Sequence, residues 1–215
     1  MKRTFIAAAV LLIAAPLGSN AAAPNYNYLY AGYSKGNVED TSGGKGYTFG
    51  GSYEFYPNWF FALDYGRNNY DGGFQTGGFF TKNYLLTIGA HMPITESMDL
   101  VARFGAANDK WNQGPSTNLF PGFTVATENT KSGIELDVGI RDMVLDQWEI
   151  NAFLGHNNAG LVSHDHDSSE FTATVGSVYN FTDQFALGVS YTRSSEESAS
   201  NFMLTGRWYF QKTLF

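Results

Sequence analysis

The sequence predicts an all-β protein, a single antiparallel up-and-down transmembrane β-barrel of about ten strands. Three observations support this fold class. Apolar and polar residues alternate along most of the chain, short connections alternate with long ones, and the first residues have the pattern of an export signal. The composition agrees, because 16% of the residues are aromatic, 24 are Gly and only 15% are charged, which is unusual for a soluble domain.

Alternation with a period of two is clearest in residues 134–141, where IELDVGIR places apolar residues on one face and polar residues on the other. The pattern recurs in residues 47–55, 61–66 and 84–91. The polar face holds mostly Gly, Ala, Ser and Thr with isolated charges, whereas the solvent face of a soluble sandwich is rich in Lys, Glu and Thr. Small residues with isolated charges indicate the interior of a narrow barrel.

The connections between these segments alternate in length. The short ones place turn residues between apolar or aromatic residues and cover residues 56–59, 93–98, 145–148 and 181–185. The long ones are polar and glycine-rich and cover about residues 35–46, 68–81, 108–131, 156–169 and 194–200. This alternation predicts an even number of strands with both termini on the short-turn side, which is the periplasmic side of such a barrel.

The expected strands are mostly close to the length of about ten residues that a tilted strand needs to cross hydrocarbon. They cover residues 26–34, 47–56, 59–67, 82–92, 98–107, 132–144, 148–156, 170–181, 184–193 and 201–210. Eight strands are the alternative, because one misassigned hairpin would remove two strands from the ring.

The N-terminus predicts a secretory signal peptide over residues 1–23, which leaves residues 24–215 for the barrel. Lys2 and Arg3 precede an apolar run that reaches Leu17, and small residues follow up to Ala23. A transmembrane anchor is the alternative, but the apolar run is shorter than the roughly 20 residues that a spanning helix needs. Without Lys2 and Arg3 the net charge changes from −7 to −9, which argues against nucleic acid as a partner.

The C-terminal strand also has the alternation of an exported barrel. Trp208 and Phe210 share the apolar parity, and the chain ends at Phe215. Alternating hydrophobic residues that end in Phe resemble the signal by which the outer-membrane insertion machinery recognises its substrates. This chain departs from the usual form of the signal, because four residues lie between Phe210, where the alternation ends, and Phe215. Either Phe is therefore the residue that this machinery would read.

The chain as a whole looks like a small bacterial outer-membrane barrel of the OmpA/OmpX-like type. YNYLYAGYSKG, GYTFGGSYEFYPNWFFALDYG and MDLVARFGAA also resemble a narrower family of ten-stranded barrels first discussed as immune elicitors of plant-associated bacteria. The resemblance covers nearly the whole mature chain and implies a monomer in the outer membrane of a Gram-negative bacterium. Its partners would be membrane lipid, lipopolysaccharide and the insertion machinery, and it brings no catalytic motif and no cofactor.

Charged residues on the polar parity are the first candidate site. Each buried charge in a narrow lumen needs an opposite partner, so we expect an arginine–carboxylate network that plugs the barrel. A gated path for ions or small solutes past this network is the alternative. We expect His91, near a short turn, to be an interior or interfacial histidine. The predicted lumen network is Glu54, Asp64, Asp99, Arg103, Glu135, Asp137, Arg141, Glu149 and Arg207.

Two further groups are predicted from their positions along the chain. Aromatic residues beside the short turns are expected to form a girdle at the periplasmic membrane surface, as rings do at such boundaries. This girdle is Tyr56, Trp59, Trp148, Phe181 and Phe185.

In the fourth long connection, alternating side chains could face one metal ion, although a surface loop offers no fixed geometry. This candidate metal site is His164, Asp165, His166 and Asp167.

The function is expected to reside in the extracellular loops, as a structural or surface-interaction role toward a host or neighbouring cell. The third loop, residues 108–131, is the longest and holds Phe120, Phe123 and other apolar residues. A small channel is the alternative. A lipid-modifying enzyme at the rim is the second alternative, because His166 and Ser168 have the spacing of one lipid A deacylase family. No nucleophile motif supports it, so the chain is not predicted to be an enzyme.

Overall fold

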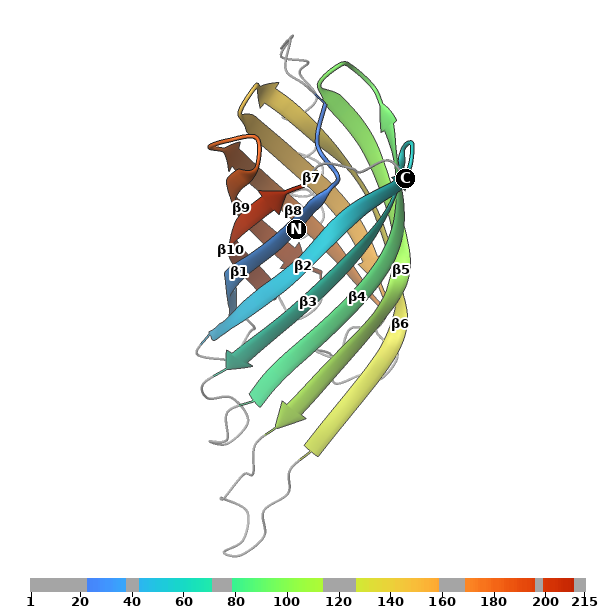
Figure 1. The fold of residues 1–215 in the computed structure, drawn as a ribbon. Helices are drawn as coiled ribbons and strands as arrows, with labels where there is room; N and C mark the ends of the chain where they lie inside the picture. The colour runs from blue at the N-terminus through green and yellow to red at the C-terminus, as the bar shows by residue number, and fades with distance from the viewer. Residues whose placement is uncertain are drawn as a thin grey trace, which may run out of the picture.

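Ten antiparallel strands form one closed barrel in the computed structural model, which describes residues 23–37, 43–70, 79–113, 127–158, 169–195 and 199–210. Each strand pairs with its neighbours in the sequence, and β10 pairs with β1 to close the ring (Figure 1). This confirms ten strands rather than eight. The strands are β1 (Tyr28–Asn37), β2 (Gly44–Tyr56), β3 (Trp59–Tyr70), β4 (Phe79–Pro93), β5 (Met98–Gln113), β6 (Thr127–Leu145), β7 (Trp148–Asn157), β8 (Glu170–Asn180), β9 (Phe185–Ser194) and β10 (Ser200–Tyr209).

Most strands extend further toward the long connections than the sequence predicts. β5 continues to Gln113 and β6 begins at Thr127, so the two ends of the predicted loop 108–131 are paired strand. Within that stretch Asp109 lies opposite Lys131. The predicted boundary is wrong here because these polar residues have the composition of a loop, whereas a strand that has left the hydrocarbon no longer needs an apolar face.

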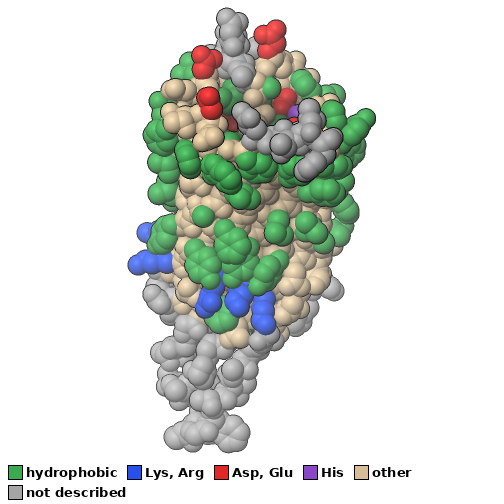
Figure 2. Space-filling model, viewed as in Figure 1, with side chains coloured by type: hydrophobic (Ala, Val, Ile, Leu, Met, Phe, Trp, Pro, Cys, Tyr) green, Lys and Arg blue, Asp and Glu red, His purple; other side chains and the backbone are tan. Residues whose placement is uncertain are grey.

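The outer wall of the barrel is apolar. Outward side chains near the middle of the strands are large and uncovered, for example Leu86 at 57% exposure and Leu63 at 54%. In Figure 2 hydrophobic side chains cover much of the visible wall. An apolar surface this large suits hydrocarbon rather than water. No helix in the described part of the chain is long and apolar enough to cross a bilayer.

The short turns gather at one edge of the barrel. Tyr28 pairs with Tyr209, so the first and last strands also begin and end at this edge. In the turn between β2 and β3, Asn58 has a positive φ of 68°, which Asn tolerates better than most residues, and it follows Pro57. The sequence of this turn therefore fits a tight reversal of the chain.

Small residues on the inner wall make room for inward-facing rings. Phe60 of β3 is 3% exposed and packs beside Gly89 of β4, where a side-chain carbon would lie within 2.7 Å of the ring. Gly139 has the same relation to Phe153 of β7. Glycine at these inner positions lets the lumen be filled by rings from neighbouring strands.

Arginine placed on the outer wall tests which part of the barrel meets hydrocarbon. We expect Leu86→Arg, near the middle of β4, to lower the free energy of unfolding by about 2–4 kcal/mol, because the charge would enter the bilayer centre. Met92→Arg, near the short-turn end of the same face, should cost only about 0–1 kcal/mol. Urea unfolding in lipid vesicles measures both, and equal costs for the two variants would contradict this placement of the wall.

Candidate functional site in the barrel lumen

A buried ion pair lies inside the barrel near the short turns. The Arg141 guanidinium donates from Nε to Glu149 Oε1 at 3.0 Å and from Nη2 to Glu149 Oε2 at 2.7 Å. Arg141 is 5% exposed and Glu149 is 1% exposed. Asn151 also donates to Glu149 Oε1 at 3.3 Å, and Arg207 Nη1 lies 3.8 Å from the same oxygen. Two-point pairing with extra donors offsets much of the cost of burying the carboxylate.

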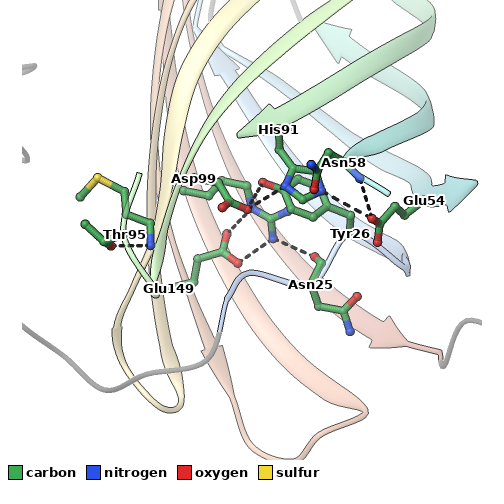
Figure 3. A network of polar contacts seen from close by, with 10 residues as sticks. Asn25, Tyr26, Glu54, Asn58, His91, Thr95, Asp99 and Glu149 are labelled. Atoms are coloured by element: carbon green, nitrogen blue, oxygen red, sulfur yellow. Dashed lines mark hydrogen bonds and ion pairs between the residues drawn. The ribbon is translucent and has the colours of Figure 1, made fainter. Parts of the chain in front are cut away.

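The residues that precede β1 enter the same end of the barrel (Figure 3). The carbonyl oxygen of Asn25 accepts a hydrogen bond from Arg141 Nη2 at 3.1 Å. The side-chain Oδ1 of Asn27 accepts a hydrogen bond from the backbone N–H of Glu54 at 2.9 Å. The backbone carbonyl of Asn27 accepts one from the backbone N–H of Phe210 at 3.2 Å. The N-terminal segment, residues 23–27, is thus bonded to β2, to β6 and to the end of β10.

Tyr26 is the centre of this packing and is 3% exposed. Its hydroxyl donates to Asp99 Oδ2 at 2.9 Å. Its ring stacks on His91 with centroids 4.0 Å apart, and the Arg141 guanidinium carbon lies 4.4 Å from the ring centroid. Burial raises the pKa of Tyr26 far above its ordinary value, and the nearby Asp99 carboxylate acts in the same direction. The phenol therefore stays protonated and remains a donor.

His91 of β4 lies between two carboxylates. Its Nδ1 is 3.1 Å from Asp99 Oδ2, and its Nε2 is 3.7 Å from Glu54 Oε1. Glu54 Oε1 accepts a hydrogen bond from the backbone N–H of Asn58 at 3.0 Å, so this carboxylate lies between the histidine and the turn that joins β2 to β3. His91 thus lies inside the barrel within ion-pair distance of two carboxylates, and neither of its ring nitrogens makes a hydrogen bond to another described residue. We name this group the mouth cluster: Tyr26, Glu54, His91, Asp99, Arg141, Glu149 and Arg207.

A second group lies deeper in the barrel. Arg103 Nη2 of β5 lies 2.9 Å from Asp137 Oδ2 of β6, and the Arg103 guanidinium carbon is 4.8 Å from the centroid of the Phe153 ring. The Tyr30 hydroxyl donates to Asp64 from β1 to β3. Asn157 donates to Glu135 at 3.4 Å. We name this group the central cluster: Tyr30, Asp64, Arg103, Glu135 and Asp137.

The nine predicted lumen residues all lie in these two clusters. Tyr28 of β1 lies between the clusters, since the guanidinium carbon of Arg207 is 4.8 Å from its ring centroid and the Tyr30 ring is 6.4 Å away. Sequence reasoning missed Tyr26 and Tyr30, which carry hydroxyl contacts in the two clusters. The segment 26–33 has apolar or aromatic residues on both parities, so alternation could not tell its inner face from its outer face. For His91 a signal existed, because it shares a parity with Thr87 and Gly89 on the inner wall.

The other predicted residues lie at the edges of the barrel or outside the described residues. All girdle residues are exposed beside the short turns: Tyr56 (64%), Trp59 (46%), Trp148 (46%), Phe181 (55%) and Phe185 (54%). Trp208 faces outward on β10, and Phe210 follows that strand. Outside the described residues are Phe215, His164, Asp165, His166, Asp167 and Ser168. Among the residues that are described, no three His, Asp or Glu side chains are placed to hold a metal ion.

Several contacts in the two clusters join strands that are not neighbours in the ring. Tyr30 joins β1 to β3, and Arg207 joins β10 to Glu149 of β7. Tyr26 joins the N-terminal segment to β5. Such contacts must run through the lumen, because the wall itself provides only neighbouring pairs. Their chemistry is mutual neutralisation of charge, with rings filling the space between the charged groups.

Solved structures that align with most of this chain have little sequence in common with it. The translocator domain of the autotransporter NalP from Neisseria meningitidis is 12% identical, has a TM-score of 0.52, and aligns over 87% of this chain and 90% of that chain. The NanC porin is 8% identical, has a TM-score of 0.51, and aligns over 85% and 100%. Ail of Yersinia pestis is 16% identical, with a TM-score of 0.44 and coverage of 85% and 96%. The first two likenesses, whose TM-scores exceed 0.5, concern the fold alone.

The sequence itself identifies the family. No curated protein matches the chain closely. The family model for the outer membrane protein beta-barrel domain, however, matches residues 5–207, which is most of the chain. The closed ring of ten strands, the apolar outer wall and the charged lumen agree with this match. The chain belongs to the outer membrane protein β-barrel domain family.

Proposed function

We propose that this outer-membrane barrel is sealed by its own side chains and acts at the cell surface through its extracellular loops. The observation that supports a sealed lumen is the mouth cluster. The N-terminal segment crosses the end of the barrel there, and Tyr26 lies between groups from β4, β5 and β6. A scaffold of this kind leaves the connections between strands as the parts available to a partner.

Energetics also support a static seal. Separating Arg141 from Glu149 would leave a buried charge without its partner, which costs about 3–5 kcal/mol in comparable sites. The contacts of Arg207 with Glu149 and of Asn25 with Arg141 would be lost at the same time. A channel would have to break these contacts for each opening, so a channel is the less favoured function.

The proposal includes the topology and the processing of the chain. Residues 1–23 serve as a signal peptide that is removed, and both termini of the mature barrel face the periplasm. The exposed rings beside the short turns, such as Trp59 and Phe185, then lie at the periplasmic membrane surface. Trp208 with Phe210 or Phe215 is the signal read by the insertion machinery. The partner of the loops is lipopolysaccharide, a host cell or a neighbouring cell, and no catalytic role is proposed.

Planar-bilayer recordings test the seal. We expect the purified wild-type barrel to give no discrete single-channel currents. The double variant Tyr26→Ala/Arg141→Ser should conduct, because it removes the ring and the guanidinium that span the mouth. The control variant Tyr33→Ala, which removes an outward-facing tyrosine of β1, should give no currents. Discrete currents from the wild-type protein would refute a sealed lumen.

Unfolding measurements test the buried ion pair. Glu149→Gln should lower the free energy of unfolding by about 3–5 kcal/mol, since Arg141 would keep its charge without its carboxylate. Adding Arg141→Met should recover part of this loss, because the unpaired guanidinium is then gone. Glu96→Gln, an exposed turn carboxylate, should change stability by less than about 0.5 kcal/mol. Additive effects of the two lumen substitutions would contradict direct pairing.

Shortening the third loop tests the surface role. Replacing residues 115–125 with a Gly-Ser linker leaves the described strands β5 and β6 intact. We expect the variant to remain in the outer-membrane fraction and to keep the faster gel migration of an unheated folded barrel. Its binding to host or neighbouring cells should fall. Unchanged cell binding with an intact barrel would argue against this loop as the site of contact.

A further inference from the structure

Basic side chains form a row on the outer face of the barrel, at the edge opposite the short turns. In Figure 2 the Lys and Arg side chains gather at this edge, below a group of hydrophobic side chains. All lie on the outward parity of their strands, on the same side as the lipid-facing residues. We name this row the basic crescent: Arg193, Lys35, Lys45, Arg67, Lys82 and Lys110, on β9, β1, β2, β3, β4 and β5.

The strand register brings these like charges side by side. Lys35 lies directly opposite Lys45 in the pairing of β1 with β2. Lys82 lies opposite Arg67 on one side and opposite Lys110 on the other. Like charges in directly opposite positions destabilise a sheet. A chain with a net charge of −7 nevertheless concentrates its outward cations here, so the arrangement needs an anion to offset the repulsion.

Among the residues that the structure describes, no carboxylate supplies that anion at the centre of the basic crescent, which is formed by Lys45, Arg67 and Lys82. The Arg67 guanidinium carbon lies 4.6 Å and Lys82 Nζ lies 5.3 Å from the centroid of the same Phe80 ring. Within the described residues no carboxylate pairs with Lys45, Arg67 or Lys82, and Arg67 Nε is buried without a hydrogen-bond partner. The exposed carboxylates of these ranges lie in the short turns at the other edge: Glu96, Asp146 and Asp183.

Tyrosine rings fix the height of the crescent relative to the bilayer. Tyr65 and Tyr84 lie two residues closer to the middle of the barrel than Arg67 and Lys82 on the same strands, and their ring centroids are 4.9 Å apart. Outward tyrosines mark the boundary between hydrocarbon and headgroups. The cations just beyond them are therefore at the level of lipid headgroups.

We propose that the basic crescent is a binding site for the phosphate groups of a phosphorylated glycolipid of the outer leaflet, the lipid A part of lipopolysaccharide. This rests on the proposed function, which places the long connections outside the cell. From Lys35 to Lys110 the row crosses four strand spacings, about 19 Å, which favours a ligand with more than one phosphate over a phospholipid with one. The lipid binds one side of the barrel only.

The opposite side of the wall supports this one-sided site. Outward positions near the same edge of β6, β7 and β8 carry Ser132, His156 and Phe171 rather than Lys or Arg. His156 packs edge-on against Phe171 with ring centroids 4.8 Å apart. A phosphate would therefore meet permanent positive charge on the β9 to β5 side and little on the β6 to β8 side.

Native mass spectrometry of the full mature protein in detergent, titrated with purified bis-phosphorylated lipid A, tests the site. We expect the triple variant Lys45→Ser/Arg67→Ser/Lys82→Ser to bind about 100-fold more weakly, at about fivefold for each cation lost near the surface. The matched control is Lys131→Ser, which removes a cation near the same edge from the inward parity of β6. This control should bind like the wild type, and all variants should keep the heat-dependent gel shift of a folded barrel.

A specific lipid A site and a general anionic surface give different results in this titration. Equal lipid A binding by the folded triple variant and the wild type would overturn the proposal. Equal binding of phosphatidylglycerol and lipid A by the wild type, lost together in the triple variant, would also overturn it in favour of a general anionic surface. The loop 115–125 variant should retain lipid A binding. A failure of the surface role would therefore appear as unchanged cell binding by this loop variant, whereas a failure of the lipid site would appear only in the lipid A titration.

Discussion

Closure of the ring between β1 and β10 is the constraint on which the rest of the structure depends. A backbone N–H or C=O group in hydrocarbon has no water to bond, so a sheet can cross a bilayer only when it has no free edge. The pairing of Tyr28 with Tyr209 through to Asn37 with Ser200 removes that edge. Once the ring is closed, every strand has one face toward lipid and one toward the lumen, and the two faces take opposite compositions.

The small lumen that closure creates explains the pairing of its charges. Polar side chains on the inner face cannot reach bulk water easily, so each charged group needs a partner within the barrel. Glu149 meets this need through Arg141, Asn151 and Arg207, and Asp137 meets it through Arg103. The N-terminal segment completes the arrangement by bringing in Tyr26, which precedes β1 and donates to Asp99 of β5.

The parts predictable from sequence are those governed by alternation. Residues 134–141 show it clearly, and the inward positions of Asp137 and Arg141 follow directly from it. The loop prediction for residues 108–113 is wrong because a paired strand beyond the bilayer has the composition of a loop. Alternation places His91 on the inner face but does not place Tyr26 on either face. Their stacking joins segments 65 positions apart in the chain and depends on the closed ring, so it could not be predicted. The candidate metal residues stay a prediction, since they lie outside the described residues.

The unequal lengths of the strands determine which part of the barrel projects furthest from its rim. β5 has 16 residues and β6 has 19, whereas β1, β7, β9 and β10 have 10 each. Six additional residues of β5 correspond to about 20 Å along the strand, and this paired ribbon projects furthest from the rim in Figure 1. The ends of this ribbon, Gln113 of β5 and Thr127 of β6, are thus directly paired with each other. In the proposed topology, a partner outside the cell would meet this ribbon first. A paired ribbon has fewer conformations than an unpaired chain of equal length, so less conformational entropy would be lost on binding.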